Sequence, residues 1–146
     1  MTALVLAATL ASSPAVEIGR VLDDLHAAAA AADEARYFAH FAPDAVFLGT
    51  DPGERWTIEA FRAYAHPRFA AGKGWTYVPR PGRHVAVDGE VAWFDEVLDN
   101  AKYGACRGTG VLRRVGGAWR VAQYSLTFLV PNRLAERVTA LVKSAP

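Results

Sequence analysis

The stretch that decides the fold runs from Trp93 to Phe128 and reads WFDEVLDNAKYGACRGTGVLRRVGGAWRVAQYSLTF. It is rich in β-branched and aromatic residues, and the pair Gly116-Gly117 interrupts it as a two-residue hairpin turn would. We predict strands at Val91–Tyr103, Gly110–Val115 and Trp119–Val130. Strands in this order form an antiparallel meander, which together with helices elsewhere in the chain defines an α+β class.

Three carboxylates, Asp95, Glu96 and Asp99, stand inside the first of these strands. A carboxylate is costly to bury unless a partner or a reaction uses it. Strand alternation places Asp95 and Asp99 on one face and Glu96 on the other, and we expect the two aspartates to face the interior. Arg107, at the start of the partner strand, offers a second interpretation, in which it pairs with Asp99 and makes that acid structural.

Length and composition indicate one folded domain. A chain of 146 residues with 52% hydrophobic and 21% charged residues can bury a core without disulfides, and its single cysteine, Cys106, cannot form an internal one. The net charge is +1 and the thirteen arginines are scattered along the chain, which argues against nucleic acid as a partner. No run of apolar residues approaches the ~20 that a membrane span needs.

The first fifteen residues, MTALVLAATLASSPA, allow two interpretations. An apolar run followed by small residues is typical of a secretory signal ending near Ala15, although no basic residue precedes Leu4. A signal would place the protein in the periplasm or outside the cell. The alternative is an N-terminal extension that packs on the domain or on a partner subunit of a cytoplasmic protein. In both cases the folded domain is expected to span residues 16–146.

Helical signals precede and follow the strands. Apolar residues recur at three- and four-residue steps from Val16 to about Phe41, where Asp33 can cap a second turn. Thr57 fits as the N-cap of another helix, which ends near Gly72 and which we expect Pro67 to kink or break. The remaining elements that we expect are short strands at Ala45–Thr50, Trp75–Val78 and Arg83–Val87, and a C-terminal helix at Arg133–Lys143.

The long strands carry apolar residues on both faces, for example Trp93 and Val97 against Phe94 and Leu98. An antiparallel sheet with one face in water should instead alternate between apolar and polar residues. We therefore predict a homodimer in which the outer face of the sheet is covered by a second copy.

Taken together, four segments of the chain resemble the nuclear transport factor 2-like superfamily, and within it the SnoaL-like group named after a polyketide cyclase. The resemblance extends from about Val21 to Asn132 and is carried by Arg36–Thr57, Phe61–Tyr77, Ala92–Gly104 and Arg107–Asn132. It implies a single-domain, cone-shaped barrel of the cystatin-like kind, in which a curved antiparallel sheet wraps around N-terminal helices. Members of the superfamily are usually dimeric and have a cavity in the cone.

The resemblance implies a function class without fixing a reaction, since the superfamily contains both enzymes and non-enzymes. Its enzymes mostly use carboxylates in an apolar cavity, without a metal or another cofactor. We therefore expect an apolar or cyclic small molecule as ligand, with Asp95 and Asp99 as catalytic acids of an isomerase, lyase or hydrolase. The alternative is a binding or protein-interaction module without turnover.

Side chains expected to bind the ligand come from the helices and from the last strand. On that strand, alternation puts Gln123, Ser125 and Thr127 on the face of Trp119 and Val121, with Tyr124 opposite, toward the dimer interface. Many relatives have a histidine near the position of Ser125, and its absence here weakens any mechanism that needs a base on this strand. The full set of expected ligand-binding residues is Tyr37, His40, Trp56, Tyr64, Trp75, Arg107, Gln123, Ser125 and Thr127.

Overall fold

The computed structural model describes residues 12–145 of the chain. The segment 1–15, interpreted as a signal or an extension, lies outside the described residues except for its last four. None of the helices within residues 12–145 is long and apolar enough to cross a membrane.

The N-terminal helical region forms two helices. α1 (Pro14–Ala30) begins after Ser13, whose side chain accepts a hydrogen bond from the Val16 amide. α2 (Glu34–Ala39) is capped by Asp33, as predicted, through a hydrogen bond from the Arg36 amide. Ala32 separates the helices with a φ of 55°, a left-handed conformation that an α-helix cannot contain.

The next helix, α3 (Ile58–Ala70), confirms Thr57 as an N-cap, since its side chain accepts a hydrogen bond from the Ala60 amide. Of the two outcomes expected at Pro67, a kink or a break, the break does not occur, because the helix continues through Pro67 to Ala70. Proline lacks its own amide donor, but the carbonyl of Pro67 still accepts from the Ala71 amide at 3.3 Å and so closes the last turn.

The described residues form a seven-stranded sheet in which β1 is parallel to β7 and the other pairs are antiparallel. The order is β2-β1-β7-β6-β5-β3, and β4 also pairs with β5. The sheet is therefore curved and mixed rather than purely antiparallel, and the short strand β2 is an element that the sequence patterns did not predict. The strands are β1 (Phe41–Leu48), β2 (Arg55–Thr57), β3 (Val78–Pro79), β4 (His84–Asp88), β5 (Val91–Asn100), β6 (Gly104–Val115) and β7 (Ala118–Phe128).

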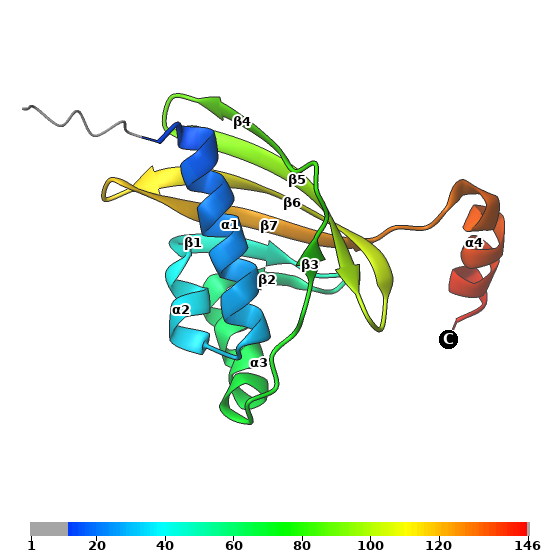
Figure 1. Cartoon of the computed structure of the whole chain (residues 1–146). Helices are drawn as coiled ribbons and strands as arrows, with labels where there is room; N and C mark the ends of the chain where they lie inside the picture. Colours follow the sequence, from blue (N-terminus) through cyan, green and yellow to red (C-terminus); the bar gives the residue numbers. More distant parts are fainter. Residues whose placement is uncertain (1–11, 146) are drawn as a thin grey trace, which may run out of the picture.

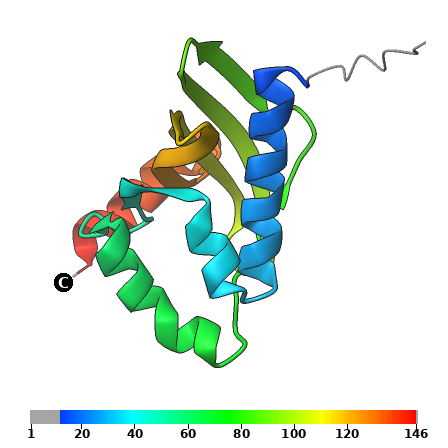
Figure 2. The same ribbon diagram turned by 90° about the vertical axis from the view of Figure 1, so that its left-hand side faces the viewer.

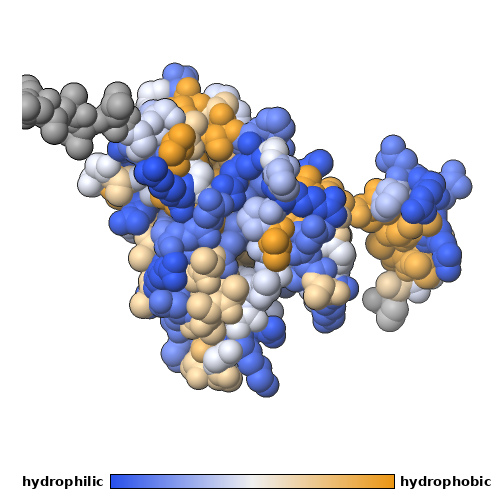
Figure 3. Space-filling model, in the orientation of Figure 1, coloured by the Kyte–Doolittle hydropathy of each residue, from blue (hydrophilic) through white to orange (hydrophobic). Residues whose placement is uncertain are grey.

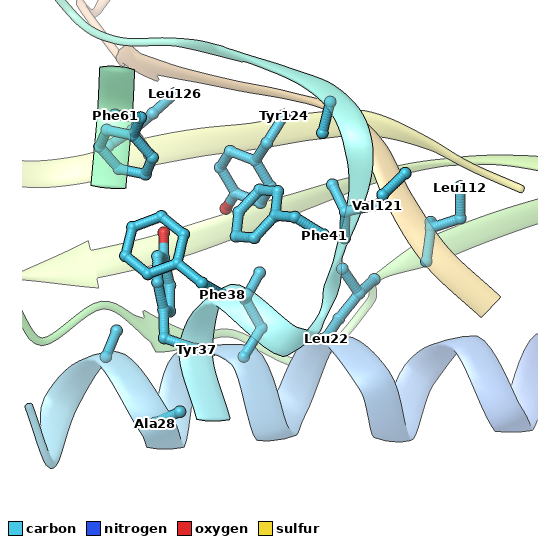
Figure 4. Close-up of a cluster of buried hydrophobic side chains, with 14 of the residues drawn as sticks. Leu22, Ala28, Tyr37, Phe38, Phe41, Phe61, Leu112, Val121, Tyr124 and Leu126 are labelled. Atoms are coloured by element: carbon cyan, nitrogen blue, oxygen red, sulfur yellow. The ribbon is translucent and has the colours of Figure 1, made fainter. Parts of the chain in front are cut away.

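The first three helices cover one face of the sheet and enclose the core (Figures 1 and 2). Apolar side chains from the helices and strands meet there, among them Leu22 of α1, Leu112 of β6 and Val121 of β7 (Figure 4). Tyr124 also points from β7 into this interior. The expected α+β fold with helices inside a curved sheet is thus confirmed.

The chain ends in a helix that stands apart from this body. A short 3-10 turn, η1 (Asn132–Leu134), leads into α4 (Ala135–Ser144), close to the predicted C-terminal helix. None of the residues of α4 is buried, and apolar side chains lie on its open surface (Figures 1 and 3).

A β-bulge in β7 changes which side chains face the core. Leu112 of β6 pairs with Val121, whereas the preceding residue, Val111, pairs with Gln123, so Ala122 is an extra residue on β7. The alternation therefore shifts by one at Ala122. This shift reverses the expected faces for the second half of the strand.

Two glycines give a matched test of packing. A Cβ at Gly110 would lie 2.2 Å from the Gln123 carbonyl oxygen and 2.8 Å from the Phe94 ring, whereas a Cβ at Gly19 in α1 meets nothing closer than 3.8 Å. We expect Gly110→Ala to lower the free energy of unfolding by about 1–3 kcal/mol, because backbone must move. Gly19→Ala should raise it by about 0.5–1 kcal/mol through helix propensity. Urea unfolding measures both, and equal effects would contradict the packing described.

Candidate functional site

Glu96 is the carboxylate that β5 turns into the core, since it is only 1% exposed. The expectation that Asp95 and Asp99 face the interior is wrong. Both are exposed, because the inward face of β5 is the one that carries Phe94 and Leu98. Alternation was predicted correctly, but the apolar residues on the other face, such as the half-exposed Trp93, made the two faces hard to distinguish.

Three side chains reach the buried carboxylate. His26 Nε2 lies 2.6 Å from Glu96 Oε1, and Arg83 Nε donates to Oε2 at 2.8 Å. The Tyr124 hydroxyl donates to Oε1 at 3.3 Å. These four residues are called the Glu96 cluster below.

Each partner is positioned by a different element. His26 lies on α1, and Arg83 immediately precedes β4, where its guanidinium also bonds the Gly19 carbonyl and Asp23. Tyr124 reaches the interior because the bulge at Ala122 turns it inward.

Room for the Tyr124 hydroxyl comes from a glycine on the neighbouring strand. Gly108 pairs with Glu96 across β5 and β6, and a Cβ there would lie 2.3 Å from the Tyr124 hydroxyl oxygen. A glycine inside a strand often marks such a close approach. Gly108 therefore permits the contact between Tyr124 and Glu96.

The electrostatics keep Glu96 ionised. Burial acts to raise its pKa, but the hydrogen bonds and charges of His26 and Arg83 outweigh burial and hold the pKa below its usual value. Burial, with the nearby Glu96 charge, raises the pKa of Tyr124 well above its ordinary range, so this phenol stays protonated. The cluster is therefore a carboxylate held by a cation, an imidazole and a phenol.

His26 contributes a charge only in its protonated form, and its neutral form is the one that can accept a proton. In that neutral form, the ionised Glu96 fixes the role of each nitrogen. An ionised carboxylate only accepts hydrogen bonds, so Nε2 carries the proton that it shares with Glu96. Nδ1 then has the lone pair, and residues 12–145 offer it no hydrogen-bond partner in the structure. An imidazole oriented by a carboxylate, with its second nitrogen unprotonated, is the usual arrangement of a general base.

An open cavity of about 650 Å³, the outer cavity, lies between α3, the hairpin joining β5 to β6, and the segment 74–77. Its volume is in the range of small-molecule sites. Trp56 and Tyr64 stack at 5.0 Å between ring centroids and form part of its wall. The other aromatic lining residues are Phe47, Phe61, Trp75, Tyr77 and Tyr103.

A smaller space of about 20 Å³, the inner chamber, lies deeper and is lined by His26, Tyr37 and Tyr124 among others. Four residues line both spaces, and this shared wall is called the neck below. They are Phe47, Trp75, Tyr77 and Leu126. The Glu96 cluster thus meets the cavity system at its inner end.

Four of the expected ligand-binding residues line these spaces. Trp56, Tyr64 and Trp75 line the outer cavity, and Tyr37 lines the inner chamber. His40 lines neither, because its Nε2 is held 2.7 Å from Asp24 in a contact between α2 and α1.

The other expected residues lie on the outer face of the sheet. Gln123 and Thr127 are exposed and Ser125 is half-buried there, because the bulge reversed the predicted alternation. The same shift makes Tyr124 an interior residue, which corrects its expected place at a dimer interface.

Arg107 and Asp99 do not meet. Arg107 is exposed and pairs with Val97 in the sheet register, two pairs away from Asp99, which pairs with Ala105. Asp99 instead accepts a hydrogen bond from Arg80 at 2.9 Å, which lowers its pKa. The interpretation of Asp99 as a structural acid fits this pair, although with a different partner.

The sequence patterns missed His26, Arg83 and Glu96 as site residues. Local spacing could not have found them, since His26 and Glu96 are 70 positions apart. One usable signal was the run Gly108-Thr109-Gly110 inside a strand, which indicates that something large approaches the backbone there. Within residues 12–145, no group of three or more His, Cys, Asp or Glu side chains is arranged to hold a metal ion.

Solved structures with this architecture belong to the nuclear transport factor 2-like class. A protein of unknown function from Pseudomonas putida KT2440 is 20% identical with a TM-score of 0.64, covering 80% of this chain and 89% of its own. A nuclear transport factor 2-like protein from Cytophaga hutchinsonii is 17% identical with a TM-score of 0.67, and the match covers 81% of this chain and 100% of that protein. A candidate dehydratase from Streptomyces avermitilis is 15% identical with a TM-score of 0.64, covering 80% and 97%. Identities this low show the fold alone.

The family is shown by sequence. The SnoaL-like domain profile matches residues 18–131, and the chain therefore belongs to the SnoaL-like domain family. A comparison with curated proteins finds no match.

The Glu96 cluster predicts a pH-dependent stability. A lowered pKa in the folded state means that ionised Glu96 stabilises the fold fully above its usual pKa of 4.5, and less as the pH falls through the folded value. We expect Glu96→Gln to cost about 3 kcal/mol of unfolding free energy at pH 7. That cost should shrink below pH 4.5.

Denaturant unfolding from pH 3 to pH 7 measures this difference. The exposed neighbour Asp95 provides the control, since Asp95→Asn should change the free energy of unfolding by no more than about 0.5 kcal/mol. A cost of Glu96→Gln that is constant across this pH range would contradict an ionised, partnered Glu96.

Proposed function

We propose that this protein binds an apolar, cyclic small molecule in the outer cavity and transfers a proton to or from it without a cofactor. The observation that carries the proposal is the buried, ionised Glu96 bonded to His26 at the inner end of an aromatic-lined cavity. The catalytic role expected for Asp95 and Asp99 passes in this proposal to His26, which Glu96 orients.

The wall of the cavity supports a cyclic ligand. The stacked rings of Trp56 and Tyr64 offer a flat apolar surface, and Trp75 and Tyr77 continue it toward the neck. A flat ring packs against such surfaces with large apolar burial.

The inner end supports acid-base chemistry. His26 would accept a proton at Nδ1, and the imidazolium that forms would be stabilised by the Glu96 carboxylate 2.6 Å from Nε2. Tyr124, whose raised pKa keeps it protonated, would turn its one O–H from Glu96 to a ligand oxygen as negative charge develops there. Proton abstraction next to a carbonyl, as in isomerases and lyases, needs this pair of groups.

Binding without turnover is a second candidate, and the small volume of the inner chamber favours it. The inner chamber measures only about 20 Å³, so a ligand confined to the outer cavity would not touch His26. The Glu96 cluster would then be a structural element that joins α1 to the sheet.

A binding screen followed by isotope exchange separates these candidates. Cyclic compounds that raise the melting temperature between pH 5 and 8 identify ligands, because binding to the native state alone stabilises it. Trp56→Ala should reduce that shift. Hits incubated in D₂O should then exchange a C–H proton, and His26→Gln should slow the exchange at least about 100-fold.

The His26→Gln variant must still bind for this result to count, so its thermal shift is the control. Exchange that continues at the wild-type rate in His26→Gln would contradict His26 as the base. Binding without exchange in the wild type would favour the second candidate.

The homodimer remains part of the proposal. Trp93 is 52% exposed on the outer face of β5, where it pairs with Val111 of β6 and Ala86 of β4. These side chains form an apolar row across three strands, which water covers in a monomer. A second copy packed face to face would bury the row on both chains.

Light scattering during size-exclusion chromatography tests this interface. We expect wild-type protein to elute as a dimer and Trp93→Glu as a folded monomer, because the new charge would be buried without a partner. Val142→Glu, at an exposed position on α4, is the control and should stay dimeric. A wild-type monomer, or a dimer lost only in Val142→Glu, would contradict an interface on the sheet.

A further inference from the structure

Three charged side chains line the outer cavity within the described residues, and two of them are cations: Arg68, Lys102 and Glu54. The carboxylate of Glu54 is folded back against its own loop. Its Oε2 accepts from the Asp51 amide at 3.2 Å and lies 2.1 Å from where a Cβ of Gly49 would be. The loop thus holds the Glu54 carboxylate, which forms a hydrogen bond with neither cation.

Arg68, near the end of α3, is exposed at the open side of the outer cavity, which is called the mouth below. One hydrogen bond holds it there. Its Nη2 donates to the Gly74 carbonyl at 3.2 Å, which leaves most of its five N–H donors for another acceptor. Among residues 12–145 no carboxylate forms a salt bridge with Arg68. By contrast, its neighbour Arg62, on the same helix, pairs with Glu34 at 3.0 Å.

Lys102 is the second exposed cation that lines the outer cavity, and it lies in the hairpin between β5 and β6. Asn100 fixes that hairpin, since its Oδ1 accepts from the amides of Lys102 and Tyr103 at 2.9 Å each. The Asn100 Nδ2 also donates to the Thr76 carbonyl at 3.0 Å, which ties the hairpin to the opposite wall. Lys102 Nζ lies 4.9 Å from the centre of the Tyr103 ring and has no carboxylate partner within the described part of the chain.

We infer that the ligand is a ring compound carrying an acidic group, such as an aromatic carboxylate, whose anion is bound at the mouth by Arg68 and Lys102. This inference rests on the proposed function, since it places the ring in the same outer cavity. Two cations without carboxylate partners beside aromatic walls match a flat anion, because a carboxylate gains charge-assisted hydrogen bonds there. A cationic ligand would meet only repulsion from them.

The position of the two cations also orients the ligand. Both cations are exposed, whereas His26 lines the inner chamber behind the four residues that the two spaces share. An anion held at the mouth directs the opposite edge of the ring toward the neck. The acidic group is therefore the part of the ligand that is recognised, and the distant edge is the part presented to His26.

Two fluorescent probes that share one ring system test the inference. 8-Anilinonaphthalene-1-sulfonate carries an anionic group that N-phenyl-1-naphthylamine lacks. We expect Arg68→Met with Lys102→Met to weaken binding of the sulfonate about tenfold, and to change binding of the neutral probe less than about twofold. Added salt should weaken only the sulfonate. Among single substitutions, Lys102→Met should weaken binding of the sulfonate, whereas Lys102→Arg, which keeps the charge, should retain most of the affinity.

Lys73 provides the matched control, because it is an exposed cation near the end of α3 that does not line the cavity. Lys73→Met should leave both affinities unchanged. Sulfonate binding that survives the double substitution, or falls equally with Lys73→Met, would overturn the inference about the anion. If Trp56→Ala affects neither probe, the proposed cavity itself is wrong, and the inference is overturned with it.

Discussion

One buried carboxylate constrains the interior of this protein. An ionised Glu96 in an apolar core would be prohibitively costly alone, so three partners must reach it from α1, from the residue before β4 and from β7. Those contacts fix where α1 crosses the sheet. The bulge at Ala122 and the bare backbone at Gly108 both serve the same contact, since each brings the Tyr124 hydroxyl to Glu96.

Most elements and part of the cavity wall could be predicted from local signals, but the Glu96 cluster could not. Thr57 and Asp33 cap their helices through side chains three residues from their partners, so sequence spacing is sufficient to find them. His26 and Glu96 are 70 residues apart, and no periodicity links them. The bulge at Ala122 left no clear signal in the sequence, yet it reversed the faces of Gln123, Ser125 and Thr127.

The acids of β5 show why burial is hard to assign from a pattern alone. The outer face of β5 carries the two aspartates, Asp95 and Asp99, and the inner face carries Glu96. Because the outer face also carries Trp93, the apolar residues of the strand do not distinguish the two faces. What decides the assignment is the availability of partners. Asp99 is satisfied at the surface by Arg80, whereas only Glu96 is close to groups that can hold a charge out of water.

The residues of the outer cavity and those of the Glu96 cluster differ in how much stability a substitution costs. Arg68 and Lys102 lie on a helix end and a hairpin tip, where substitutions cost little stability, whereas each member of the Glu96 cluster is tied to the folding of the core. Substitutions can therefore change the groups at the mouth, and with them the ligand, whereas the requirement to fold constrains the Glu96 cluster. Under the proposed function, proteins with this interior would differ widely in ligand and still share proton transfer as their chemistry.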